Sequence, residues 1–337
     1  MKTNRNVTSD QPLLRSFGAA GKRQVTQSCH VSRVTCHASR VTRAAFSLVE
    51  VLLAMTLLSL IVLALMAVFN STQTAFRASV TQTDVLEGGR AAMDMMTADL
   101  RQLTPSLGGS NEFFNGYYSQ EPVNFYVNTN SNQPLIQPLL ASPDNQQRTN
   151  VLEDFFVLGR GNLNGRPAWI AVGYAVYPAS QTSFNPLYRF YMTTNVAAAS
   201  PQTLFTNFTY AVVTGSLTNW SHLLDGVVDL RVHAYDTNGV WMTIGYTNTA
   251  KNVRFLPSAP GETGFCMFSN TLPASVEIEL SVLEDRALQR AESLAIAGQP
   301  PSPSAAIQWR YLQNQAGKVH IFRQRVTIPN VDSSAYQ

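Results

Sequence analysis

A strongly apolar run without charges begins directly after Glu50, and the next charged residue along the chain is Arg77. Residues 51–69 of this run are nearly all apolar, which is close to the roughly 20 residues that a helix needs to cross a bilayer. The run predicts a transmembrane helix over residues 46–69. A carboxylate inside such a segment is costly and marks a candidate functional site. The plainer interpretation is a Glu50 carboxylate that reaches water at the edge of an ordinary membrane anchor.

The segment before the apolar run is basic. Residues 1–45 hold eight Lys or Arg and one acidic residue, out of 24 basic and 21 acidic residues in the whole chain. Removing this segment leaves 16 basic and 20 acidic residues, so the net charge changes from +3 to −4. Because Lys and Arg stay cytoplasmic, the C-terminal part is expected outside the cytoplasm. No basic patch remains that would favour a nucleic-acid partner.

A secretory signal peptide is the alternative interpretation of this N-terminal region. Such a peptide has a shorter apolar run that ends in an Ala-x-Ala-like cleavage site. No good site of this kind lies near Ala64 or Ala67. The sequence therefore favours a single membrane-spanning helix.

The junction Ala45-Phe46-Ser47-Leu48-Val49-Glu50-Val51-Leu52 resembles the N-terminal processing motif of type IV prepilins and type II secretion pseudopilins. The resemblance implies cleavage between Ala45 and Phe46 by prepilin peptidase, followed by N-methylation of Phe46. Glu50 would then be the fifth mature residue. Ala45 departs from the Gly that usually precedes the cut. In this family the Glu would meet the Phe46 amine of a neighbouring subunit, and such a buried pair can set the register of an assembly.

The C-terminal half resembles the body of J-type minor pseudopilins in three successive segments, residues 224–236, 239–241 and 272–280. The whole chain also resembles the pseudopilin-like Verru_Chthon cassette proteins. The resemblance implies a pilin-like α+β fold, in which a long N-terminal transmembrane helix packs on an antiparallel β-sheet body. It also implies a minor pseudopilin-like subunit of a type II secretion system or a related type IV filament.

The same resemblance implies a location and a set of partners. The protein would cross the inner membrane once, with its N-terminus cytoplasmic and its globular domain periplasmic. Its partners would be other pilin-like subunits, prepilin peptidase, the inner-membrane assembly platform and the lipid bilayer. The chain would contribute no catalysis of its own.

Three regions are expected along the chain: a removed basic leader (1–45), one long helix (46–104) and a β-rich domain (105–337) with a helical excursion near 284–298. Pro105 and Gly108-Gly109 should end the long helix. Beyond the membrane, an apolar stripe predicts packing of the helix on a sheet of the same subunit; its members are Val80, Leu86, Met93, Met96, Leu100 and Leu103. Gly88-Gly89 is a candidate bend, and Asp99 is assigned to the polar surface.

Segments rich in β-branched and aromatic residues predict strands at 123–127, 155–158, 169–177, 187–192, 205–213, 227–235, 241–246, 276–283 and 320–328. Asp236-Thr-Asn-Gly239 predicts a hairpin turn that leads into Trp241. After cleavage the remaining cysteine is Cys266, which lies between aromatic residues and is expected to be a small buried hydrophobe.

Other functional classes have weaker support. His222, His233 and His320 belong to no catalytic motif, so an enzyme is not expected. Oxygen ligands for calcium occur together, but their spacing does not match a calcium loop and a turn explains them equally well; they are Asp225, Asp229, Asp236 and Asn238. Cys29-His30 and Cys36-His37 are too far apart for the usual zinc spacing. We therefore expect no cofactor and no metal.

A membrane-anchored or pilus-borne binding or adhesion module remains the alternative to the pseudopilin interpretation. Tyr, Asn and Gln side chains gathered in residues 110–150 and 181–210 would suit ligand binding. Inert surface loops explain the same composition. A deletion strain that loses secretion but keeps surface binding would favour the pseudopilin.

Overall fold

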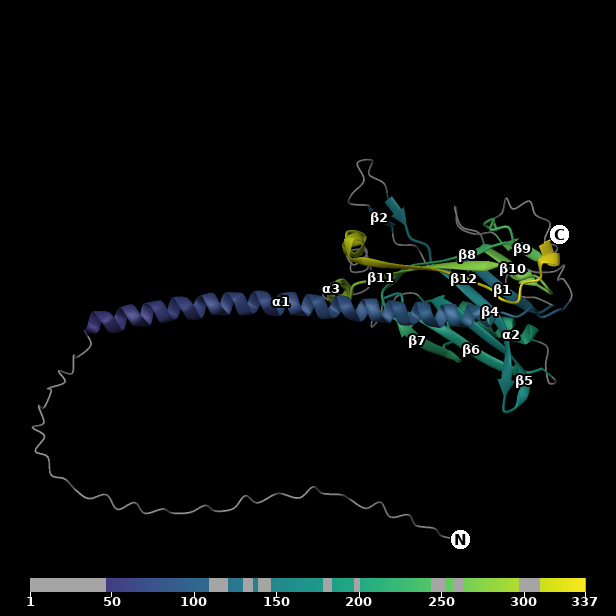
Figure 1. Ribbon diagram of the computed structural model, residues 1–337, viewed down its shortest axis with the longest axis horizontal. Coiled ribbons are helices and arrows are strands. Elements are labelled where there is room, and N and C mark those ends of the chain that lie inside the picture. Colours follow the sequence, from purple (N-terminus) through teal and green to yellow (C-terminus); the bar gives the residue numbers. More distant parts are fainter. Residues whose placement is uncertain are drawn as a thin grey trace, which may run out of the picture. The chain divides into compact units, whose positions relative to one another are not determined.

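The computed structural model of the protein describes residues 47–108, 121–129, 136–138, 147–177, 184–196, 201–243, 252–256, 264–296 and 310–336 (Figure 1). The chain divides into two compact units, Met1–Leu63 and Ala64–Gln337, and each is described by itself. The described residues form one long apolar N-terminal helix and a body of antiparallel sheets. This confirms the α+β class that the sequence predicts.

The long helix is α1 (Leu48–Arg101), slightly shorter than the predicted range 46–104. Leu, Ala and Met, which favour helices, dominate its first part. At its end the Thr104 N–H donates to the Leu158 carbonyl, 2.9 Å away, and Leu103 bridges Gly159. The chain has therefore left the helix before Pro105, which could not continue it.

In the second unit, the burial of α1 begins at Val85. The buried residues recur at three- and four-residue spacings, as expected for one helix face; they include Val85, Gly89, Ala92, Met93, Met96 and Leu100. The predicted stripe is confirmed from Met93 onward and is wrong at Val80, which is 42% exposed. The helix reaches the body one turn later than the sequence indicates.

Gly88 and Gly89, the candidate bend, lie inside α1, which continues through both. A Cβ on Gly89 would lie 2.3 Å from Cε2 of Phe322. Gly89 therefore lets a strand of the body approach the helix backbone closely.

The body contains one seven-stranded sheet in the order β7-β6-β5-β4-β1-β10-β9. Its strands are β1 (Val123–Thr129), β4 (Glu153–Leu163), β5 (Arg166–Val176), β6 (Leu187–Asn195), β7 (Trp220–Leu224), β9 (Val253–Leu256) and β10 (Gly264–Phe268). A three-stranded sheet has the order β12-β11-β8, built from β8 (Val227–Tyr235), β11 (Ser275–Leu283) and β12 (Val319–Thr327). A small hairpin pairs β2 (Ile136–Pro138) with β3 (Gln147–Thr149). All pairings between these strands are antiparallel.

Most of the predicted strands are confirmed. The prediction at 227–235 matches β8, and those at 276–283 and 320–328 match β11 and β12 within one residue. The helical excursion is confirmed as α3 (Asp285–Ile296), and the segment after it lies outside the described residues. The predicted turn at Asp236 is confirmed as well: its carboxylate accepts hydrogen bonds from the N–H groups of Asn238 and Val240.

The predicted strand at 205–213 is wrong, because these residues form helix α2 (Gln202–Thr214). Leu204, Phe205, Phe208 and Ala211 are buried and share one helix face. Their spacing favours a helix, but the aromatic and β-branched content suggested a strand. Gly215, with φ of 67°, ends the helix in the left-handed region.

The predicted strand at 241–246 is not formed over the residues that the structure describes. Trp241 makes a single bridge to Tyr235, and residues 244–246 lie outside the described part.

Five further strands were not anticipated: β2, β3, β7, β9 and β10. All five are short, with three to five residues each, which leaves too few positions for a recognisable alternation.

The main core lies between α1 and the apolar faces of the two larger sheets, with Met96, Leu100, Phe155 and Ile278 fully buried. A second cluster forms where α2 covers the seven-stranded sheet, and there a Cβ on Gly173 would lie 2.3 Å from the Phe208 ring. Cys266 is buried in this cluster, as predicted, and burial raises the pKa of its thiol.

Candidate functional site

The start of α1 carries the one described residue among the predicted processing and assembly positions, Glu50. The Ser47 N–H donates to Oε2 of Glu50 at 3.2 Å, and the Glu50 N–H donates to Oγ of Ser47 at 3.2 Å. This reciprocal pair is a capping box, which satisfies two N–H groups at the helix N-terminus. The Glu50 carboxylate of a single subunit is therefore engaged locally. Ala45 and Phe46 lie outside the described residues.

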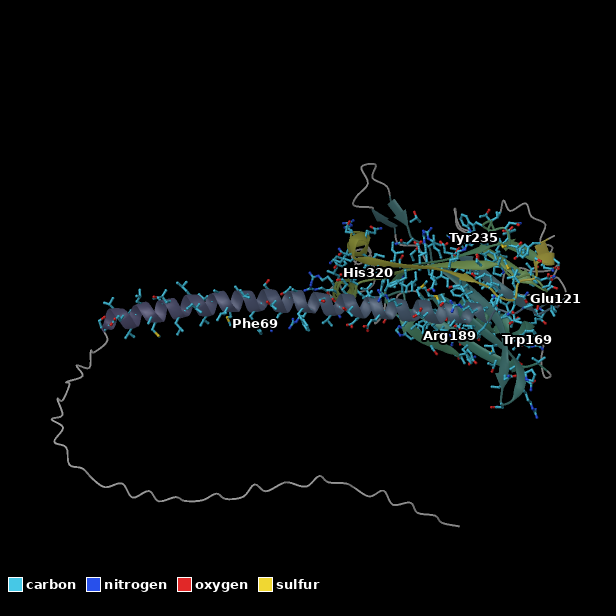
Figure 2. All side chains as sticks on the ribbon, viewed as in Figure 1. Phe69, Glu121, Trp169, Arg189, Tyr235 and His320 are labelled. Atoms are coloured by element: carbon cyan, nitrogen blue, oxygen red, sulfur yellow. The ribbon has the colours of Figure 1, made fainter. Side chains whose placement is uncertain are left out.

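Large apolar side chains of α1 are exposed from Leu48 to Leu63 in the first unit and from Leu65 to Phe69 in the second; together they are called here the apolar helix surface. Its large apolar side chains are between 51% and 76% exposed. Phe69 projects from the helix, as Figure 2 shows. An exposed apolar surface of this extent marks a site that another apolar phase or protein covers.

The few polar side chains on the apolar helix surface satisfy their own hydrogen bonds. The Thr56 hydroxyl donates to the Leu53 carbonyl and the Ser59 hydroxyl to the Thr56 carbonyl, both at 2.8 Å. Neither hydroxyl then requires water, so these two groups add little to the cost of moving the surface into an apolar medium. Among the described residues, α1 is long and apolar enough to cross a membrane, judged by length and composition.

A buried ion pair fastens the other half of α1 to the seven-stranded sheet. Asp99 is 5% exposed and accepts two hydrogen bonds from Arg189 on β6, at 2.8 and 3.0 Å. The Tyr174 hydroxyl on β5 donates to the same carboxylate at 2.5 Å. Burial first, and then the Asp99 charge, raise the pKa of Tyr174 above its ordinary value. Three groups thus hold the helix in one position on the sheet; Figure 2 labels Arg189 among them.

Sequence reasoning missed this ion pair because Asp99 was assigned to the exposed side of the helix. A signal was present: Asp99 follows Met96 by three residues and precedes Leu103 by four, which places it on the buried face. Its partner Arg189 is 90 residues away and could not be found from spacing.

The four candidate calcium ligands have separate roles. Asp229 accepts from the Val151 N–H at 2.6 Å and pairs with Arg231. Asp225 pairs with His222 at 3.0 Å, whereas Asp236 and Asn238 build the turn after β8. Within the described ranges, no group of three or more His, Cys, Asp or Glu could hold a metal ion.

The histidines considered for catalysis lie on three different strands, His222 on β7, His233 on β8 and His320 on β12. His222 pairs with Asp225, His233 lies 4.6 Å from the Trp241 ring and His320 lies 3.3 Å from Glu284. Each belongs to a different local contact.

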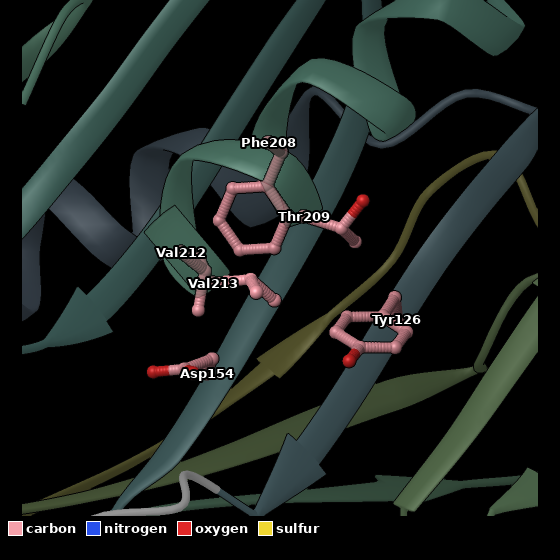
Figure 3. Close-up of a pocket in the computed structure, with 6 residues that line it drawn as sticks. All are labelled: Tyr126, Asp154, Phe208, Thr209, Val212 and Val213. Atoms are coloured by element: carbon pink, nitrogen blue, oxygen red, sulfur yellow. The ribbon is translucent and has the colours of Figure 1, made fainter. Parts of the chain in front are cut away.

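A small pocket opens beneath α2 (Figure 3). Phe208, Thr209, Val212 and Val213 of α2 line one side, and Tyr126 of β1 with Asp154 of β4 line the other. Its volume is about 20 Å³. This is enough for about one water molecule and far below what a small-molecule ligand requires. The apolar helix surface is therefore the stronger candidate site.

No family model, no curated protein and no solved structure matches this chain.

Proposed function

We propose that this chain is a minor pseudopilin-like subunit of a type II secretion system or a related type IV filament assembly. Prepilin peptidase would cleave it between Ala45 and Phe46, and the new N-terminus would be methylated. The apolar helix surface would first anchor the subunit in the inner membrane and then pack against neighbouring subunits. The body of sheets would lie in the periplasm.

One observation carries the proposal: the large side chains of the apolar helix surface are all more than half exposed, and a single carboxylate, Glu50, lies near its start. An ordinary anchor needs apolar residues but has no use for an acidic one, since a charge in a span is costly. A filament subunit has such a use, because the free amine of Phe46 needs a counter-charge when it enters an apolar environment.

The body of the protein supports an assembly role in a second way. The ion pair of Asp99 with Arg189 fixes α1 on the seven-stranded sheet. A helix that transmits position between packed subunits has to be rigidly attached to its own globular part. Partners would be other pilin-like subunits, the inner-membrane assembly platform and the lipid bilayer.

Cross-linking between subunits tests the proposal. A Leu58→Cys variant places a thiol on the apolar helix surface, where Leu58 is 58% exposed. Cys29→Ser and Cys36→Ser remove the leader thiols, and the remaining Cys266 is buried. Packed helices lie about 8–10 Å apart, so a bismaleimide of about that length can join neighbours. We expect a covalent dimer in membranes, since each subunit then carries one reactive thiol.

The matched control is the same variant in cells without prepilin peptidase, where the unprocessed chain should stay monomeric. Equal cross-linking with and without the peptidase would contradict assembly that depends on processing. A complete lack of cross-linked products from several positions on this surface would contradict assembly itself.

A further inference from the structure

The three-stranded sheet ends at β12, whose outer edge is not covered by any strand that the structure describes. β12 pairs with β11 over nine consecutive residue pairs, from Val319 with Leu283 to Thr327 with Ser275, without a register shift. It contains no proline. The strand therefore lacks a proline or a bulge, two of the devices by which proteins block pairing at a sheet edge.

Two flanking hydrogen bonds show which backbone groups point outward. The Glu284 N–H donates to the Lys318 carbonyl and the Ile328 N–H donates to the Ala274 carbonyl. In an antiparallel ladder, hydrogen-bonded pairs alternate with non-bonded ones. The even-numbered residues of β12 therefore bond to β11. The backbone groups of Ile321, Arg323 and Arg325 point to the outer edge.

On one face of this sheet, side chains form two rows in which a glutamate of β11 lies between residues of β8 and β12. Across the register, Arg231 of β8, Glu279 of β11 and Arg323 of β12 lie in one row. His233, Glu277 and Arg325 lie in the next.

Both rows end on an arginine at the outer edge. Arg323 donates to Glu279 through Nε at 2.9 Å and lies 3.5 Å from Glu277, yet its side chain is still 63% exposed. Arg325 lies 3.8 Å over the ring of Tyr235. A fourth strand that continues the alternation would carry carboxylates in both rows.

We propose that the outer edge of β12 binds an extended protein segment that carries two carboxylates two residues apart. The segment would add to the sheet as a fourth strand, with backbone hydrogen bonds to Ile321, Arg323 and Arg325. Side chains two residues apart in a strand share a face, so both carboxylates would lie opposite the two arginines. Opposite charges on directly paired residues stabilise a sheet.

A second copy of β12 is a poor occupant. An antiparallel pairing centred on Arg323 would place Arg323 against Arg323, and like charges directly opposite each other destabilise strand pairing. By contrast, the Glu277-Ile278-Glu279 pattern of β11 already pairs with this strand on its other side. The occupant is therefore a partner segment with the charge pattern of β11. This inference does not depend on N-terminal processing of the chain.

Peptide binding to the full-length protein in detergent micelles tests the proposal. The probe is a fluorescent synthetic peptide with the sequence of residues 275–283, SVEIELSVL, and the control peptide is SVKIKLSVL. Two cross-strand charge pairs predict a preference of at least about fivefold for the acidic peptide. Equal binding of the two peptides, or no binding of either, would overturn the proposal.

Two protein variants separate the backbone and the charge contributions. Ile321→Pro removes an outward N–H without removing a hydrogen bond to β11, and proline is tolerated at edge strands. We expect it to lose binding of the acidic peptide while the body stays folded by circular dichroism. Arg323→Gln with Arg325→Gln should bring the two peptides to equal affinity. A preference that persists in this double variant would also overturn the proposal.

Discussion

Replacing Glu50 by Ala is expected to reduce incorporation of the subunit into filaments by about tenfold or more, while the body of sheets remains folded. Without its carboxylate, the Phe46 amine of the neighbouring subunit would enter the apolar interior unpaired. A charge at the centre of a membrane helix costs about 2.5–3.5 kcal/mol. That cost corresponds to a factor of about 60 to 400 in an equilibrium. The measurement is the amount of the variant in sheared or cross-linked filaments relative to the membrane pool.

A second substitution separates the charge of Glu50 from its role in the capping box with Ser47. Glu50→Gln can keep the capping box, because Gln serves at the same position. If assembly requires the negative charge, Glu50→Gln should reduce incorporation into filaments nearly as much as Glu50→Ala. If capping alone matters, Glu50→Gln should be incorporated normally. Glu87→Ala is the matched control, since Glu87 is exposed on the same helix outside the apolar helix surface. Normal incorporation of both Glu50 variants would contradict the assembly role.

Replacing Asp99 by Ala is expected to lower the free energy of unfolding by about 3–5 kcal/mol, because it leaves a partly buried charge without its partner. Arg189 would lose both of its hydrogen bonds to the carboxylate, and the buried Tyr174 hydroxyl would lose its acceptor. The measurement is denaturant unfolding of the full chain in detergent, followed by the fluorescence of the body. The Arg189 side chain is 21% exposed, so water can replace only part of the hydrogen bonding that Arg189 loses with the carboxylate.

Asp94→Ala is the control for this experiment, because Asp94 lies on the same helix but is exposed. A surface change of this kind should alter stability by no more than about 0.5 kcal/mol. Removing both partners, as in Asp99→Leu with Arg189→Met, should recover much of the loss, since buried ion pairs can often be replaced by apolar groups. A loss below about 1 kcal/mol for Asp99→Ala would show that the ion pair does not fasten the helix.

The sequence predicted correctly those helices and strands whose type follows from the pattern of their own residues. Strand β8 was predicted at Val227–Tyr235 because its residues from Leu230 onward alternate between the core and the surface. Helix α2 was misread, because its aromatic and β-branched residues favour strands in isolation. Packing on the seven-stranded sheet decides in favour of the helix, and packing on a distant strand cannot be read from one segment.

The sequence likewise pointed to those candidate residues that belong to a local motif, and it missed those that depend on contacts between distant segments. Glu50 was chosen as a candidate because the motif that points to it consists of adjacent residues: a basic leader, a small residue before Phe46 and an apolar run. The ion pair of Asp99 was missed because it depends on a residue that only the folded chain brings near. Arg323 and Arg325 of β12 were also missed, because their role depends on the register of β12 with β11.

Mass spectrometry of the N-terminal peptide of the membrane-extracted protein tests the central claim most directly. The protein should be taken from cells with and without prepilin peptidase. The account predicts a peptide that begins at N-methylated Phe46 in the presence of the peptidase, and an intact N-terminus when it is missing. An intact leader in both strains, or a cut after the apolar run, would contradict the account and favour an anchored or secreted binding module.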